Sequence, residues 1–70
     1  MTFFQTKILY PHTTSAGVII PQNTQIIITE SDDPASEFYV IEQYYYQNHW
    51  YSLGSEKILK NTCGDRIPLL

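Results

Sequence analysis

The sequence predicts an all-β protein, folded as a single small domain over residues 1–70 and built as a curved antiparallel sheet or barrel of four to six short strands. Runs of four to ten residues rich in isoleucine, valine, tyrosine and threonine alternate with glycine, proline and paired aspartates, which is typical of short strands joined by turns. Little of the chain shows the apolar spacing of a helix. Seventy residues suffice for one core but not for a second.

Three strands are expected in the first half of the chain, at residues 4–10, 17–20 and 25–30, with a polar loop at 12–16. The first strand ends at Pro11 and the second at Pro21, because proline cannot donate to a strand ladder. Residues 21–24 have the composition of a tight turn, in which proline presets φ and Asn23 tolerates an unusual backbone conformation. The run Ile26–Ile28 is apolar at successive positions, so we expect both faces of this strand to be covered locally.

A long hairpin is expected at residues 38–53, which contain five of the six tyrosines and the only tryptophan. A two-residue turn at Gln47 and Asn48 would give the cross-strand pairs Tyr46–His49, Tyr45–Trp50, Tyr44–Tyr51 and Glu42–Leu53. Strand alternation then separates two sets of side chains, Val40, Tyr44, Tyr46, Tyr51 and Leu53 on one side and Tyr39, Ile41, Tyr45 and Trp50 on the other. Both sides are aromatic, and only one can form the core of so small a domain unless a partner covers the other.

The remaining segments are expected to be a loop and a short closing element. Residues 31–36 read as a turn or loop around Pro34. Residues 55–60 begin like a capped turn and are either a final short strand or one helical turn. Residues 61–70 are either an extended, frayed C-terminal tail or a strap that docks on this domain or on another chain.

The order of these features resembles that of SH3-like barrels. The features are the hairpin Ile20–Glu30, the acidic loop Ser31–Glu37, the aromatic pair Trp50-Tyr51 beside a turn and the short closing element Ile58-Leu59. The resemblance implies a fold and not a function, because one fold carries many functions.

Cysteine usage and apolar runs indicate the compartment. Cys63 is the only cysteine, so no disulfide can form within one chain, and a reducing environment is expected. The segment 1–7 lacks a basic end followed by an unbroken apolar run, so no targeting segment is expected. The longest apolar stretches fall far short of the ~20 residues that cross a bilayer. We therefore expect a cytoplasmic protein.

The distribution of charge indicates the kind of partner. The net charge is −3, and there is no lysine or arginine between Lys7 and Lys57. Only Lys57, Lys60 and Arg66 supply positive charge near the C-terminus. Nucleic-acid binding requires cations against phosphates, so conventional DNA or RNA binding is not expected. A partner with a basic surface suits the acidic centre of the chain better.

No residue pattern indicates catalysis, a cofactor or a metal. His12, His49 and Cys63 lie too far apart in the sequence for the close ligand pairs of a structural zinc site. Cys63 stands in the C-terminal segment, where an oriented catalytic group is hard to build. Asp32 and Asp33 are adjacent in a proline-containing loop and read as turn formers. The three glycines are scattered, so there is no phosphate-binding loop.

The tyrosine cluster is the strongest candidate for a binding surface. Cross-strand aromatic pairs stabilise hairpins on their own account, and that is the simpler interpretation. However, each buried tyrosine hydroxyl needs a partner, and tyrosine and tryptophan are enriched at interfaces. The predicted partner-binding residues are Tyr39, Tyr45 and Trp50 as the contact face and Asp32, Asp33 and Glu37 as its acidic rim. The opposite assignment, with Tyr44, Tyr46 and Tyr51 outward, stays open.

These observations favour a non-enzymatic protein-interaction module that acts as a small accessory or regulatory subunit. One alternative is a small acidic inhibitor, of the kind mobile elements encode, that blocks the cationic groove of a nucleic-acid-binding enzyme. A second alternative is a single-stranded nucleic-acid binder that stacks bases on the aromatic sheet. Homo-oligomerisation is also open as a source of stability for so short a chain.

Overall fold

The computed structural model describes residues 2–33 and 35–69. Met1, Leu70 and Pro34, around which the acidic loop was expected to turn, lie outside the described residues. The elements in chain order are β1 (Phe3–Lys7), β2 (His12–Thr13), β3 (Ile19–Ile20), β4 (Gln25–Glu30), β5 (Phe38–Tyr46), β6 (His49–Leu59), the 3₁₀ turn η1 (Lys60–Thr62) and β7 (Ile67–Leu69). The described part of the chain has no helix long and apolar enough to cross a membrane.

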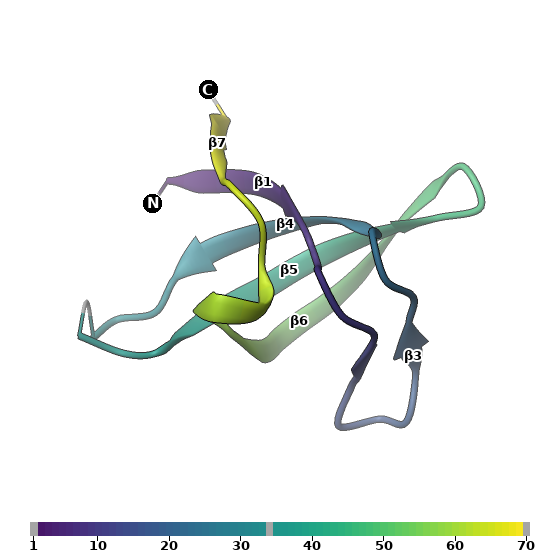
Figure 1. Ribbon diagram of the computed structural model, residues 1–70, viewed down its shortest axis with the longest axis horizontal. Coiled ribbons are helices and arrows are strands. Elements are labelled where there is room, and N and C mark those ends of the chain that lie inside the picture. The colour runs from purple at the N-terminus through teal and green to yellow at the C-terminus, as the bar shows by residue number, and fades with distance from the viewer. Residues whose placement is uncertain (1, 34, 70) are drawn as a thin grey trace.

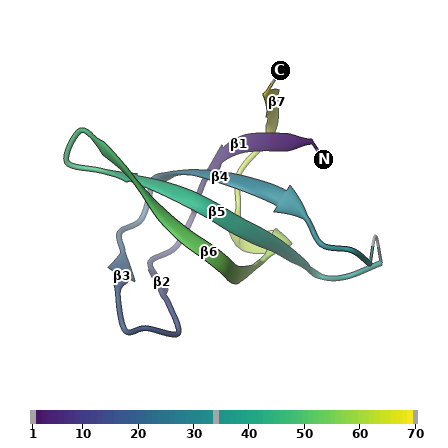
Figure 2. The same ribbon diagram turned by 180° about the vertical axis from the view of Figure 1, so that it is seen from behind.

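The all-β prediction is confirmed. Five strands form one antiparallel sheet in the order β6-β5-β4-β1-β7, and β2 pairs with β3 in a separate two-stranded ribbon. The sheet is strongly curved but does not close into a barrel, because β6 and β7 remain its two edges (Figure 1). In the view from behind, the edge strand β6 is clearly visible, and the β2–β3 ribbon lies below the sheet (Figure 2).

The core is made of isoleucines rather than tyrosines. Its buried members are Ile8, Ile20, Ile26, Ile28, Ile41, Ile58 and Cys63. Isoleucine suits this position because a β-branched side chain packs well on a pleated surface. The run Ile26–Ile28 is covered unequally, since Ile26 and Ile28 are fully buried while Ile27 on the other face is only half-buried.

Both predicted turns are present. Asn23 adopts φ 69° and follows Pro21, whose carbonyl accepts a hydrogen bond from the Thr24 amide. Gln47 and Asn48 adopt φ 50° and 67°, as a two-residue turn of the primed type requires. The C-terminal segment is not frayed in this structure, because β7 pairs with β1 through Phe3–Leu69, Phe4–Pro68 and Gln5–Ile67.

A β-bulge at Glu42 overturns part of the predicted face assignment. Ile27 pairs with Gln43, whereas Ile28 pairs with Ile41, so Glu42 is an extra residue in β5. The register with β6 also shifts there, and the expected pair Glu42–Leu53 does not form. An extra residue reverses the alternation of all side chains beyond it. Consequently Tyr39 and Ile41 share the core side of the hairpin with Tyr44, whereas Tyr45 and Trp50 point away from it; Val40 also leaves its predicted side.

Candidate binding surface at the aromatic tip

The far end of the β5–β6 hairpin carries aromatic side chains on both of its sides. We call this set the aromatic tip, and it consists of Tyr44, Tyr45, Tyr46, His49, Trp50 and Tyr51. The tight turn pairs the two strands in the predicted register, with Tyr46 opposite His49, Tyr45 opposite Trp50 and Tyr44 opposite Tyr51. The hairpin projects beyond the other strands, so the tip stands out from the body of the molecule (Figure 1).

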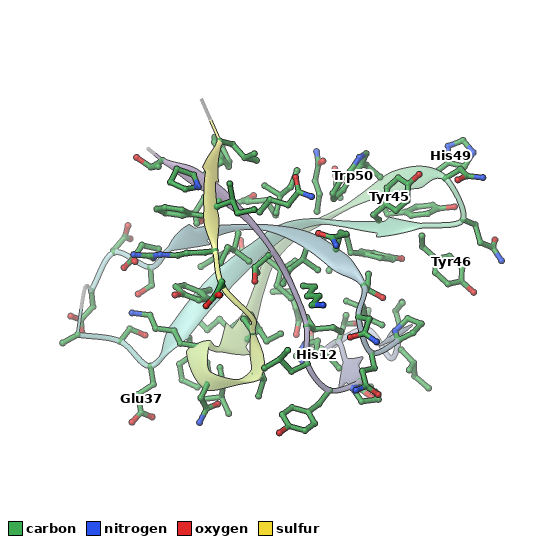
Figure 3. The ribbon with its side chains drawn as sticks, turned by 45° about the horizontal axis from the view of Figure 1, so that its top comes forward. His12, Glu37, Tyr45, Tyr46, His49 and Trp50 are labelled. Atoms are coloured by element: carbon green, nitrogen blue, oxygen red, sulfur yellow. The ribbon has the colours of Figure 1, made fainter. Side chains whose placement is uncertain are left out.

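On the outer side of the sheet, Tyr45 and Trp50 form one contact pair. Their ring centroids lie 5.1 Å apart with an interplanar angle of 59°, which is the tilted arrangement that aromatic quadrupoles favour. The Tyr45 hydroxyl donates to Oδ1 of Asn48 at 3.2 Å, which fixes the ring against the turn. Figure 3 shows this pair on one side of the hairpin and Tyr46 on the other.

On the inner side, Tyr44 and Tyr51 stack with centroids 5.3 Å apart and an interplanar angle of 24°. His49 meets the edge of Tyr51 at a centroid distance of 6.3 Å. Tyr44 packs against the isoleucine core and is half-buried, whereas Tyr51 reaches beyond it. The stack therefore joins the tip to the core and leaves its outer members in solvent.

The tip is aromatic, is mostly exposed and contains no acidic, lysine or arginine side chain. The exposed fractions of its outermost aromatic residues are 37% for Tyr45, 41% for Tyr46, 42% for Trp50 and 41% for Tyr51. No Asp, Glu, Lys or Arg occurs from Gln43 to Ser55. Depletion of charge together with enrichment of tyrosine and tryptophan is the composition of an interface centre.

The chain matches no protein-family model, no curated protein and no solved structure. The chemistry of the tip is therefore the available guide to its role. Rigid aromatic side chains with polar ends are suited to contact protein surfaces or to stack on nucleobases.

Tyr39 does not lie beside Tyr45 and Trp50, although it was predicted to share their face. Its ring lies below two cations, with Lys60 Nζ 5.3 Å and Arg66 Cζ 5.7 Å from its centroid. Arg66 Cζ also lies 4.3 Å above the ring of Phe4. Tyr39 thus packs in a cluster with Lys60 and Arg66 near the start of β5, at the end of the hairpin opposite the aromatic tip.

Glu30 holds this cluster together. Arg66 donates to Glu30 Oε1, and Lys60 Nζ lies 3.8 Å from Oε2. The hydrogen bond from Arg66, aided by the charge of Lys60, outweighs desolvation and holds the pKa of the Glu30 carboxyl below its usual value. The same bond raises the pKa of Arg66. Two of the four cations of the chain are therefore engaged with one carboxylate.

The predicted acidic rim does not border the aromatic pair. Glu37 lies at the opposite end of the molecule from Tyr45 and Trp50 (Figure 3). Along an extended strand, the separation of Glu37 from Tyr45 corresponds to about 25 Å. The structure therefore brings Tyr45 and Trp50 together but separates them from Tyr39 and from the acidic loop, so the six residues do not form one site.

In the acidic loop, Asp33 stabilises the turn through local hydrogen bonds. Asp33 Oδ1 accepts from the Ala35 amide at 3.0 Å, and the Asp33 carbonyl accepts from the Ser36 amide and the Ser31 hydroxyl. This is the turn-forming role expected of an aspartate. Asp32 and Asp33 also line an open hollow of about 560 Å³. The other lining residues are Thr29, Glu30, Ser31, Ser36, Val40, Glu42 and Lys57.

A contact that the sequence did not indicate joins the ribbon to β6. Glu56 accepts hydrogen bonds from the Ser15 amide and hydroxyl, each at 3.1 Å, and pairs with His12 Nε2 at 3.2 Å. Desolvation raises the pKa of the Glu56 carboxyl, but these hydrogen bonds outweigh it and leave the pKa below its usual value. The partners lie more than 40 positions apart in the sequence, so no local pattern could have revealed them.

Cys63 packs in the core, and burial raises the pKa of its thiol. It is therefore a poor nucleophile, since the thiolate is the reactive form. Among residues 2–33 and 35–69, no three histidine, cysteine or acidic side chains converge closely enough to hold a metal ion.

Proposed function

We propose that this protein is a non-enzymatic protein-interaction module, an accessory or regulatory subunit that binds its partner through the aromatic tip. The observation that carries the proposal is the placement of Tyr45 and Trp50, which are paired, exposed and directed away from the isoleucine core. If Tyr45 and Trp50 served only to form the core, their side chains would be expected on the opposite, buried side of the hairpin. Because Cys63 is the only cysteine, we further propose a reducing, cytoplasmic setting.

A protein partner is favoured over single-stranded nucleic acid because the tip lacks cations. Lys60 and Arg66 contact Glu30 near the opposite end of the sheet, and Lys57 lines the acidic hollow. Base stacking without phosphate contacts would forgo the electrostatic part of nucleic-acid affinity.

The test is capture of partners by the immobilised protein from a lysate of its source cells, at low and high salt. We expect a specific protein to be retained at both salts, because apolar docking is weakly screened. Trp50→Ala should abolish retention. The matched control is Tyr10→Ala, which removes a tyrosine that is 61% exposed and lies outside the hairpin. Equal retention by Trp50→Ala and the native chain would refute the proposal.

A small acidic inhibitor is the second candidate, and one observation supports it. Among the described residues, Asp32, Asp33 and Glu37 form no salt bridge, so their charges can meet a basic partner. In the same capture experiment this function requires a basic nucleic-acid enzyme that is retained only at low salt. Such retention should be lost in the double variant Asp32→Asn, Asp33→Asn and should be unaffected by Trp50→Ala.

A further inference from the structure

Residues 49–53, the half of β6 that lies next to the Gln47-Asn48 turn, form an unprotected sheet edge. We call this the outer half of β6 and the rest of the strand its inner half. β6 is the last strand of the sheet, so one side of its backbone has no neighbouring strand among the described residues. Proteins normally protect such an edge with charged residues, proline or a bulge. The opposite edge strand β7 contains Pro68. The inner half of β6 has Glu56, Lys57 and the register shift near Gly54, whereas residues 49–53 have none of these devices.

The turn geometry shows which backbone groups are free. In a two-residue hairpin the residues that flank the turn form a hydrogen-bonded pair, and such pairs then alternate with non-hydrogen-bonded ones. His49 and Tyr51 therefore direct their N–H and C=O groups toward β5. Trp50 and Ser52, which belong to the alternate pairs, direct theirs toward the open edge.

We propose that two copies of this chain dimerise by antiparallel pairing of residues 49–53 of β6, with Tyr51 opposite its own symmetry mate. This register is the one in which the free groups match. Trp50 of each copy lies opposite Ser52 of the other, so the two residues exchange both of their backbone hydrogen bonds. Two such pairs give four hydrogen bonds around one two-fold axis, as an isologous interface requires. The two five-stranded sheets become one continuous sheet.

The side chains fit the same register. On the outer face the small Ser52 lies opposite the large Trp50 of the other copy, which leaves room for the indole. On the inner face the Tyr44–Tyr51 stack meets its symmetry mate and becomes a row of four tyrosines. The pairing ends at Gly54, where the register of β6 shifts, and just before Glu56, where the ribbon contacts β6.

Charge also favours a second copy as the occupant. Each copy has a net charge of −3, and two copies would repel each other through a charged edge. The span from Gln43 to Ser55 contains no Asp, Glu, Lys or Arg, so the two copies can approach along this edge without repulsion between like charges. The dimer leaves Tyr45 and Trp50 of both copies on one outer face, so it extends the proposed binding surface and does not consume it.

The first test is sedimentation equilibrium of the full chain from 1 µM to 1 mM, a range set to include weak dimers. We expect a reversible monomer–dimer equilibrium. Ser52→Pro removes an outward N–H from each copy without touching the β5 pairing, and should weaken the dimer by about tenfold to a hundredfold. Ser52→Thr keeps the N–H and should dimerise like the native chain. A native chain that stays monomeric throughout, or a dimer unaffected by Ser52→Pro, overturns the proposal.

The second test fixes the register and does not depend on Ser52. Residues at a non-hydrogen-bonded pair lie with Cα atoms about 4.5 Å apart, within the range a disulfide can bridge. Oxidised Tyr51→Cys should therefore form a covalent dimer, whereas Trp50→Cys should not, because its symmetry mate lies two positions along the strand. Both variants retain the buried Cys63, which makes each a control for the other. Cross-linking through Trp50→Cys but not Tyr51→Cys would contradict the register.

Discussion

The β5–β6 hairpin has two halves, one on each side of the register shift at Glu42, and both are antiparallel but differ in chemistry. In the inner half, Ile41 and Ile58 are buried, and Glu56 ties the sheet to the ribbon. In the outer half, beyond the bulge at Glu42, tyrosines and Trp50 stand in solvent and no residue is charged. The inner half excludes water from the core, whereas the outer half leaves large aromatic side chains exposed. This division supports the proposal that a partner binds at the aromatic tip.

The largest effect is expected from truncating the inner half. Ile41→Ala removes a fully buried side chain and should lower the free energy of unfolding by about 2–5 kcal/mol. Tyr45→Ala, four positions along the same strand, loses only an exposed cross-strand contact and should cost under about 1 kcal/mol. Urea unfolding of both variants measures the difference. Similar losses for the two would show that the halves are not energetically distinct.

A smaller effect is expected at the junction between the halves. Gly54 adopts φ +74°, and a Cβ added there would meet nothing within 4 Å. Gly54→Ala therefore introduces backbone strain alone, about 1–2 kcal/mol. Gly17→Ala is the matched control, since Gly17 has φ +86° and equally open surroundings in the ribbon loop. In urea unfolding, the two variants should lose similar amounts of unfolding free energy. Only Gly54→Ala should shift the amide resonances of the aromatic tip. An unperturbed tip would mean that Gly54 does not shape it.

The division between the halves could be only partly predicted from the sequence. The predictions of turns at Asn23 and at Gln47-Asn48 were correct, because asparagine and proline favour turns through local backbone preferences. The cross-strand pairs of the tip followed from the turn. The side on which Tyr39 lies did not follow, because the bulge at Glu42 depends on how β4 and β6 pair with β5 and not on local composition.

The acidic loop illustrates the same limit. Asp32, Asp33 and Glu37 were expected to form an acidic rim beside the aromatic face. In the structure, the length of β5 separates them from Tyr45 and Trp50, so proximity in the sequence did not become proximity in space. Of the isoleucine core, only the run Ile26–Ile28 was expected to be covered, and Ile26 and Ile28 are indeed buried. The other buried isoleucines were not proposed, because the tyrosines dominate the composition of the hairpin.

The third prediction concerns the hydrogen bonds by which Glu56, in the inner half of β6, contacts His12 and Ser15 of the ribbon. Glu56→Gln removes the charged acceptor of three hydrogen bonds and should cost about 1 kcal/mol at neutral pH. The folded-state pKa of Glu56 is lowered from 4.5, so this stabilisation is fully present above 4.5 and is lost as the pH falls through the folded pKa. The difference from the native chain should therefore vanish in acid. A difference between Glu56→Gln and the native chain that stays constant with pH would show that the Glu56 carboxylate does not stabilise the contact with the ribbon.

The smallest effect on folding is expected at the residue with the largest proposed role in binding. Trp50→Ala removes an exposed ring whose main described contact is Tyr45, so it should lower the free energy of unfolding by only about 0.2–1 kcal/mol. Trp50→Phe keeps an aromatic partner for Tyr45 and should lose less. Urea unfolding measures both variants at a protein concentration below that of any dimer, because association would add to the apparent stability. A loss above about 2 kcal/mol is the size expected for a core residue. The tip would then belong to the core, and its exposure would no longer argue for a partner.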